Sequence, residues 1–190
     1  MKRRIVVAIS GASGSIYGIR LLEALRRQED IEIHLILSQW AEENIRIETD
    51  FSVEEVRALA HYNYRNDEMG ARISSGSFRA SGMAVVPCSM KTLAAIACGL
   101  SGNLIARAAD VMLKERRSLI IVPRETPLNA IHLENMLKLA RMGVSIVPPI
   151  PSFYHRPASL GDLIDHFTGR VLDLMGIEHE MQGRWNDGLE

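Results

Sequence analysis

The chain has 190 residues, of which 47% are apolar and 24% are charged, values typical of one soluble globular domain. Twenty-two basic and 23 acidic residues leave a formal net charge of −1, which excludes the basic surplus of a nucleic-acid binder. Two cysteines without a CxxC spacing predict neither a disulfide framework nor structural zinc. The first apolar run is too short for a signal peptide and no run approaches a membrane span, so we expect a cytoplasmic protein.

Short apolar runs alternate with segments of helical periodicity along the chain. The pattern predicts strands at residues 5–9, 31–37, 83–87, 119–123 and 144–147. It predicts helices at 16–27, 39–48, 52–59, 91–98, 103–117, 131–142 and 159–175, and an irregular segment at 63–77. This alternation predicts a single three-layer α/β domain over 1–190, Rossmann- or flavodoxin-like, with helices on both faces of a mostly parallel sheet.

Residues that follow the strands are the candidate ligand contacts, because parallel sheets bind ligands at the carboxyl ends of their strands. The first strand leads into Gly11, Ala12, Ser13 and Gly14, small residues that open a helix whose free amides favour an anion. The spacing is GxxG rather than GxGxxG, and the second strand ends at Ser38, where a dinucleotide site offers an acidic residue. The pattern favours a mononucleotide such as a flavin, with a plain tight turn as the alternative.

Two further strand ends carry candidate groups. The third strand is followed by Ser89, Met90, Lys91 and Thr92, whose hydroxyls and amides suit either a helix cap or a flavin contact. The fourth is followed by Arg124 and Glu125, which suit either a binding site or a surface ion pair. Sequence alone leaves both pairs of alternatives open.

Cations also stand beside apolar helix faces. Arg107 and Lys114 lie within about 20° of each other on the 103–117 helix, and Arg170 falls at the edge of the apolar arc of the last helix. Together with Arg124, they are candidates for a fork that binds a second, smaller phosphate. The alternative is that each cation pairs with a carboxylate of the chain or extends to solvent.

Several long blocks together resemble one family, the UbiX-type flavin prenyltransferases, formerly described as aromatic acid decarboxylases. The blocks run nearly end to end: GASGSIYG, SSGSF, PCSMKTLAAIA, RAADVMLKERR, VPRETP, HLENM, PPIPSFYHRP and a late RW pair. The resemblance implies that dimethylallyl monophosphate prenylates reduced FMN without a metal. A bond forms at the central-ring nitrogen and a second bond to the dimethylbenzene ring closes a fourth ring. The product, prenylated FMN, would serve UbiD-type decarboxylases in ubiquinone biosynthesis or in aromatic acid decarboxylation.

The resemblance also implies residue roles. Ser13 would lie near the reacting nitrogen and Glu125 would handle a proton, while Tyr154 and Trp185 offer aromatic faces to an allylic cation. The donor phosphate would be bound by Arg107, Lys114, Tyr154 and Arg170, with Lys114 also counted as catalytic. FMN would be held by Gly11, Ala12, Ser13, Ser38, Ser89, Met90, Lys91, Thr92 and Arg124.

The family forms homo-oligomers, commonly dodecamers with shared sites, so we expect segment 176–190 at the active site or a subunit interface. Three other functions are weighed against this interpretation. An FMN-dependent decarboxylase of cysteine-derived carboxylates would carry a PASANT-like segment and a catalytic histidine in the first half. Here PCSMKT stands in that place, and neither His34 nor His61 lies in a matching motif. Direct decarboxylation of aromatic acids and a non-catalytic FMN carrier are the other two.

Overall fold

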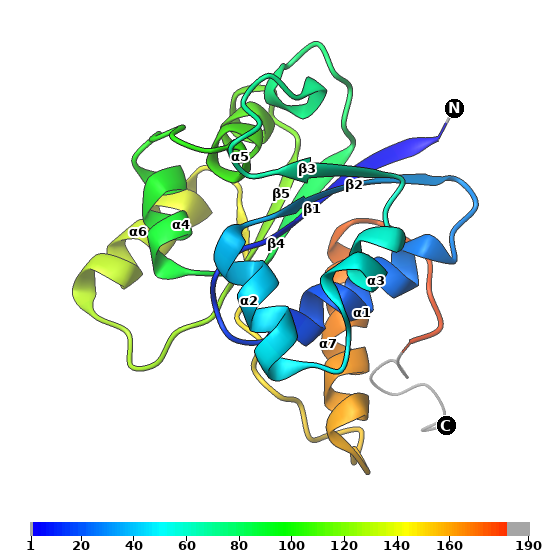
Figure 1. The fold of residues 1–190 in the computed structure, drawn as a ribbon. Coiled ribbons are helices and arrows are strands. Elements are labelled where there is room, and N and C mark those ends of the chain that lie inside the picture. Colours follow the sequence, from blue (N-terminus) through cyan, green and yellow to red (C-terminus); the bar gives the residue numbers. More distant parts are fainter. Residues whose placement is uncertain (1, 182–190) are drawn as a thin grey trace.

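The computed structural model describes residues 2–181, which form one parallel sheet between two layers of helices (Figure 1). The sheet order is β3-β2-β1-β4-β5-β6, and every adjacent pair is parallel. The strands are β1 (Arg3–Ile9), β2 (Ile31–Leu37), β3 (Tyr62–Arg65), β4 (Gly82–Cys88), β5 (Ser118–Pro123) and β6 (Ser145–Ile146).

Two apolar cores lie on opposite faces of the sheet, because successive side chains of a strand point to opposite faces. Ile5, Val7 and Ile9 of β1 belong to one core, and Val6 and Ala8 belong to the other. The first core is covered by α1 (Ser15–Arg26), α2 (Gln39–Glu48), α3 (Val53–Ala58) and α7 (Leu160–Leu174). The second is covered by α4 (Met90–Ala97), α5 (Leu104–Lys114), α6 (Ala130–Arg141) and the short 3-10 helix η1 (Arg72–Ser74).

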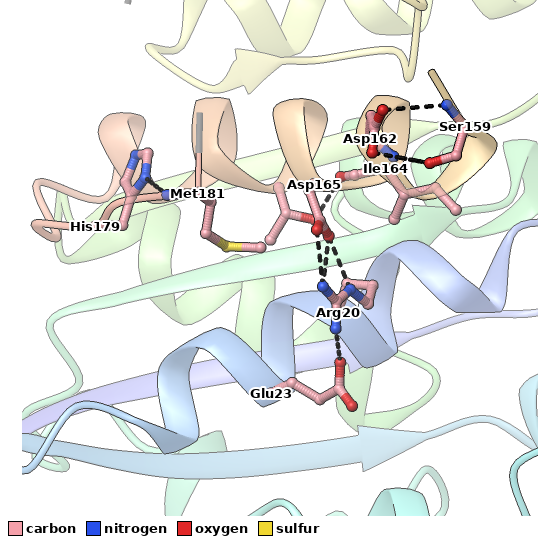
Figure 2. A network of polar contacts seen from close by, with 9 residues as sticks. Arg20, Glu23, Ser159, Asp162, Ile164, Asp165, His179 and Met181 are labelled. Atoms are coloured by element: carbon pink, nitrogen blue, oxygen red, sulfur yellow. Dashed lines mark hydrogen bonds and ion pairs between the residues drawn. The ribbon is translucent and has the colours of Figure 1, made fainter. Parts of the chain in front are cut away.

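Helix α7 is fastened to α1 and to the start of β1. Arg20 of α1 forms a bidentate ion pair with Asp165, with Nη2 2.7 and 2.9 Å from the two carboxylate oxygens (Figure 2). At the other end of α7, Arg3 donates to the carbonyls of Met175 and Gly176 at 2.7 and 2.9 Å. These contacts fix α7 at its middle and at its C-terminal end.

The predicted α/β architecture is confirmed, and the predicted strands and helices appear with boundaries shifted by a few residues. The segment 63–77 was predicted to be irregular, but it contains most of β3 and all of η1. Strand β3 has the sequence YNYR at the edge of the sheet, with Tyr62 exposed, so it lacks the apolar run that marks a buried strand. Within residues 2–181, no helix is long and apolar enough to cross a membrane.

Candidate functional site

The order in which successive strands are added to the sheet reverses between β1 and β4. Strands β2 and β3 lie on one side of this point, and β5 and β6 lie on the other. The helices that follow β1 and β4 cover opposite faces, and the carboxyl ends of two such strands are the usual ligand position in folds of this kind. The small-residue loop after β1 and the Ser89 loop after β4 therefore lie at the position expected for a ligand.

Hydrogen bonds join four strand ends into one structure, which we call the carboxyl rim (residues 10–14, 38, 88–92 and 124–125). Ser10 is buried; its Oγ donates to the Pro87 carbonyl at 3.1 Å and accepts from the Ser89 amide at 2.8 Å. The Ser38 amide donates to the Ile9 carbonyl, and the Arg124 amide donates to the Cys88 carbonyl, each at 3.1 Å. The four loops that the sequence predicted as ligand contacts therefore lie together at one edge of the sheet, within a single chain.

The loop after β1 needs its glycines. A Cβ on Gly11 would lie 2.5 Å from the Cβ of Trp40, and Gly14 has a φ of 96°, in the left-handed region. Glu48, at the end of α2, accepts hydrogen bonds from the amides of Gly14 and Ser15 at 2.8 and 3.2 Å. This carboxylate occupies the start of α1 that we expected to hold an anion, so that expectation is corrected. What the loop offers a ligand is the segment Gly11 to Ser13.

The starts of α2 and α4 are capped by the predicted hydroxyls. Ser38 Oγ accepts from the Ala41 amide at 3.1 Å, and Ser89 Oγ accepts from the Thr92 amide at 3.3 Å. Ser89 also donates to Thr92 Oγ1 at 3.1 Å. The capping interpretation is therefore confirmed. It does not exclude ligand binding, because each cap takes one of the amides that a helix start leaves without an intrahelical partner, and the others favour an anion.

Arg124 and Glu125 extend from the end of β5 and are both exposed. Glu125 Oε1 accepts a hydrogen bond from the Thr126 amide at 3.0 Å, which holds the carboxylate at the rim. Burial raises the pKa of Tyr17 on α1, and the positive charge of Arg124 opposes that rise. Cys88 beneath them is fully buried and burial raises the pKa of its thiol, so it packs as a small apolar residue.

Three of the predicted phosphate-binding cations bind carboxylates of their own helix or the adjoining residue. Arg107 pairs with Asp110 at 2.7 Å, Arg170 pairs with Asp173 at 3.0 Å, and Lys114 pairs with Glu115. Arg170 was expected at the edge of the apolar arc, yet 54% of its side chain is exposed. Within one chain, the interpretation as local ion pairs is the one that the structure shows.

The predicted phosphate fork does not assemble within one chain. Arg107 and Lys114 belong to α5 on one face of the sheet, whereas Arg170 belongs to α7 on the other. Lys114 also precedes the first residue of β5, and Arg124 follows the last, so the six-residue strand separates them by about 20 Å. Sequence periodicity placed each cation on its helix correctly but could not show which helices share a face.

Tyr154 contacts α7, the helix that carries Arg170. The Tyr154 hydroxyl lies 3.1 Å from Nε2 of His166, and Arg170 stands one turn further along α7, close enough for its charge to lower the pKa of His166. Trp185 lies outside the described residues. Of the predicted segment 176–190, residues 176–181 lie near the start of β1 and the C-terminal end of α1, where Gln28 donates to the Glu178 carbonyl at 3.2 Å.

Sequence reasoning missed three residues of this region. Glu48 caps α1 from 34 positions away, and no linear signal links it to Gly14. Trp40, with 70% of its surface exposed, packs on Gly11. Its position as the second residue of a helix that follows a strand was a sequence signal that could have pointed to this region. The contact between His166 and Tyr154 is made only in the folded chain, and no sequence pattern signals it. Among residues 2–181, no group of three or more His, Cys, Asp or Glu side chains could hold a metal ion.

Comparison with known proteins shows the family and agrees with the fold. The chain matches the Flavoprotein family over residues 1–172. It is 54% identical over 183 residues to the flavin prenyltransferase LpdB of Lactiplantibacillus plantarum, covering 96% of this chain and 98% of that protein. A similar solved structure is AnUbiX (PadA1) in complex with FMN and dimethylallyl pyrophosphate, with a TM-score of 0.96, 55% identity and 98% of both chains covered.

A second similar structure is a dodecameric FMN-dependent UbiX-like decarboxylase from Escherichia coli O157:H7. Its TM-score is 0.95 at 50% identity, covering 96% of this chain and 99% of that one. The resemblance drawn from the sequence motifs is thus confirmed over nearly the whole chain. The family match over residues 1–172, together with half-identical relatives of matching length, makes this chain a member of the flavin prenyltransferase family of flavoproteins.

Proposed function

We propose that this protein transfers a dimethylallyl group from a dimethylallyl phosphate to reduced FMN. The allylic C–O bond of the donor breaks and phosphate leaves, while the central-ring nitrogen of the flavin bonds to the allylic carbon and loses its proton. The remaining double bond of the prenyl group then takes up a proton and bonds to the dimethylbenzene ring, which loses a ring proton in turn. The observation that carries the proposal is the carboxyl rim at the β1–β4 switch point. Further support comes from the similar protein AnUbiX, which binds FMN and dimethylallyl pyrophosphate.

The rim fits a flavin mononucleotide in two parts. Because Glu48 already supplies a carboxylate to the start of α1, the Gly11 to Ser13 segment suits the flavin ring system rather than the phosphate. The capped starts of α2 and α4 and the guanidinium of Arg124 suit the phosphate, through free amides and positive charge. The proposed FMN contacts are Gly11, Ala12, Ser13, Ser38, Ser89, Met90, Lys91, Thr92 and Arg124.

The donor phosphate would be bound by four residues, Arg107, Lys114, Tyr154 and Arg170, which we call the donor-binding residues. Placed cations stabilise the phosphate as negative charge grows on it during C–O cleavage. Since α5 and α7 lie on opposite faces of the sheet, one chain does not bring the four together. We therefore assign Arg107 and Lys114 to a neighbouring copy in a homo-oligomer; a similar protein is a dodecamer.

Glu125 is the rim carboxylate best placed to move a proton. It stands exposed beside Arg124, and its Oε1 is held by the Thr126 amide. Closing a fourth ring on the flavin requires removal of a ring proton, and a positioned carboxylate is an efficient acceptor for it. Ser13 would lie beside the reacting nitrogen, and Tyr154 and Trp185 would face the allylic cation.

The product, prenylated FMN, would pass to a UbiD-type decarboxylase. Both cysteines of the chain are unpaired, Cys88 in the core and Cys98 on the surface, as is usual for proteins of a reducing compartment. We therefore place the transfer and the hand-over in the cytoplasm.

The test is anaerobic incubation of the protein with reduced FMN and dimethylallyl monophosphate, without added metal, followed by mass spectrometry of the flavin. A mass gain of one five-carbon unit is expected. The diphosphate donor is run in parallel and establishes donor preference. Flavin that binds but stays unmodified with both donors would favour an FMN carrier or a decarboxylase, and assays with aromatic and cysteine-derived carboxylates would then separate those two.

A further inference from the structure

Three aromatic side chains form a compact cluster where the loop after β6 meets α7. The His166 ring is 5% exposed and stacks on His155 with ring centroids 4.3 Å apart and 12° between the planes. The ring of Tyr154 stands at 80° to that of His166, and its hydroxyl lies 3.1 Å from Nε2. The cluster places a buried histidine directly behind an exposed tyrosine.

The partners of the imidazole nitrogens decide where the ring proton sits. Nδ1 of His166 is buried and has no hydrogen-bond partner in the described part of the chain, whereas Nε2 faces the Tyr154 oxygen. A neutral imidazole carries one N–H, and a buried N–H without an acceptor costs more than an unused lone pair. The favoured tautomer therefore has its proton on Nε2, with the Tyr154 oxygen as the acceptor.

We propose that His166 is a positioning residue that donates its Nε2–H to Tyr154 and thereby turns the phenol's own O–H proton toward the donor phosphate. With the opposite tautomer, the phenol would donate to His166 and present only oxygen lone pairs to an anion, which would repel it. The inference rests on the proposed function, because it takes Tyr154 to be a donor-binding residue.

The surroundings of His166 support a fixed, neutral ring. Its neighbour Asp165 is held by Arg20 (Figure 2). Burial lowers the pKa of His166, and positive charge on His155 and Arg170 lowers it further. A ring that stays neutral keeps a single N–H, and a helix anchored to α1 keeps that N–H aimed at Tyr154.

The first test is a double-mutant cycle read as the KM for dimethylallyl monophosphate. His166→Leu should raise this KM about tenfold, the effect of losing one well-placed hydrogen bond to a charged group. In a Tyr154→Phe background, which lacks the hydroxyl, the same change should have less than about a twofold effect. His166→Gln, whose amide can replace the Nε2–H, should return the KM to within about threefold of wild type.

The matched control is Thr168→Val, a near-isosteric change at a buried position of the same helix. It should leave the donor KM unchanged, and all variants should keep the wild-type Kd for FMN. An effect of His166→Leu that is equally large in the Tyr154→Phe background, or that Thr168→Val reproduces, would overturn the proposal, because it would show that His166 only supports the helix.

The second test reads the tautomer in the wild-type protein by solid-state NMR of ¹⁵N-histidine, with His166→Gln used to assign the signal. A proton on Nε2 and a bare Nδ1 are expected, whereas a proton on Nδ1 would overturn the proposal. This measurement needs no turnover. A protein with the expected tautomer but no prenylated product would therefore count against the proposed function and not against the orientation of the Tyr154 hydroxyl by His166.

Discussion

The carboxyl rim and the donor-binding residues are assembled in different ways. The rim is complete within one chain, where backbone hydrogen bonds and the buried Ser10 join the ends of β2, β1, β4 and β5. The donor-binding residues are split between α5 and α7 on opposite faces of the sheet, and their cations are held by local carboxylates. From this difference we infer that the proposed flavin site belongs to the single fold, whereas the proposed donor site depends on how copies assemble.

The largest effect should come from the rim carboxylate. In Glu125→Gln, the rate of prenylated FMN formation should fall by about 10² or more, the usual contribution of a positioned proton acceptor. The Kd for FMN should stay within about threefold, because the substitution removes no cation or amide that faces the phosphate. Single-turnover mass spectrometry and flavin fluorescence titration measure the two quantities. Unchanged turnover would remove Glu125 from the catalytic residues.

The next effect separates the two regions directly. Arg170→Ala should raise the KM for the donor by roughly 10- to 100-fold, since a charge-assisted contact to phosphate is lost. FMN affinity should stay within about threefold, because Arg170 belongs to α7 and not to the rim. Lys138→Ala, a remote lysine on α6, serves as the control for loss of a positive charge. If Arg170→Ala weakened donor and FMN equally, the division into two regions would be wrong.

A smaller effect should follow from loosening the rim. Glu48→Gln replaces a charged acceptor of the Gly14 and Ser15 amides by a neutral one, at a cost of about 1 kcal/mol. FMN affinity should fall by about fivefold while the donor KM does not change, the reverse of the Arg170→Ala pattern. Isothermal titration of FMN and donor kinetics give both values. An unchanged FMN Kd would show that the Glu48 contact does not shape the flavin site.

A change inside the sheet that carries both regions should have the smallest effect on catalysis and should act on stability instead. His34 is fully buried between Glu32 and the Tyr64 hydroxyl, each 3.0 Å from a ring nitrogen, and burial lowers its pKa although Glu32 opposes this. As pH falls below about 6.5, His34 takes up a proton in the unfolded chain while it stays neutral in the folded chain. The free energy of unfolding therefore drops by up to about 1.4 kcal/mol per pH unit. His34→Gln should flatten this acid slope between about pH 6.5 and 5.

Urea unfolding at pH 7 and pH 5.5 measures the slope, with His132→Gln as a control at a partly exposed histidine of α6. Both the donor KM and the FMN Kd at pH 7 should be unchanged in His34→Gln. An acid slope equal to that of the wild type would show that His34 does not titrate during unfolding.

The rim was predictable from sequence because it follows a general rule for parallel sheets. Residues directly after Ile9, Leu37, Cys88 and Pro123 had to meet at one edge once the strands were identified. Strand β3 was missed because an exposed edge strand needs no apolar run. Glu48 was missed because its contact with the start of α1 joins two helix ends that only the tertiary fold brings together.

The arrangement of the donor-binding residues lay beyond sequence periodicity. A helical wheel fixes the angle of Arg107 and Lys114 on α5, but it carries no information on whether α7 covers the same face of the sheet. The local partners Asp110, Glu115 and Asp173 lie one or three positions away in sequence, so the alternative of local ion pairs could be weighed from sequence. The tautomer of His166 depends on contacts that only coordinates supply.

The most direct test of the account is a mixed oligomer made by co-expressing Lys114→Ala and Glu125→Gln chains with different affinity tags and purifying through both. Each variant alone should form little prenylated FMN. If one copy supplies the rim and another supplies Lys114, random mixing leaves about a quarter of the sites with both residues intact, and that share of wild-type product formation should return. Mixed oligomers no more active than either variant alone would contradict the account, because the two residues would then have to act from the same chain.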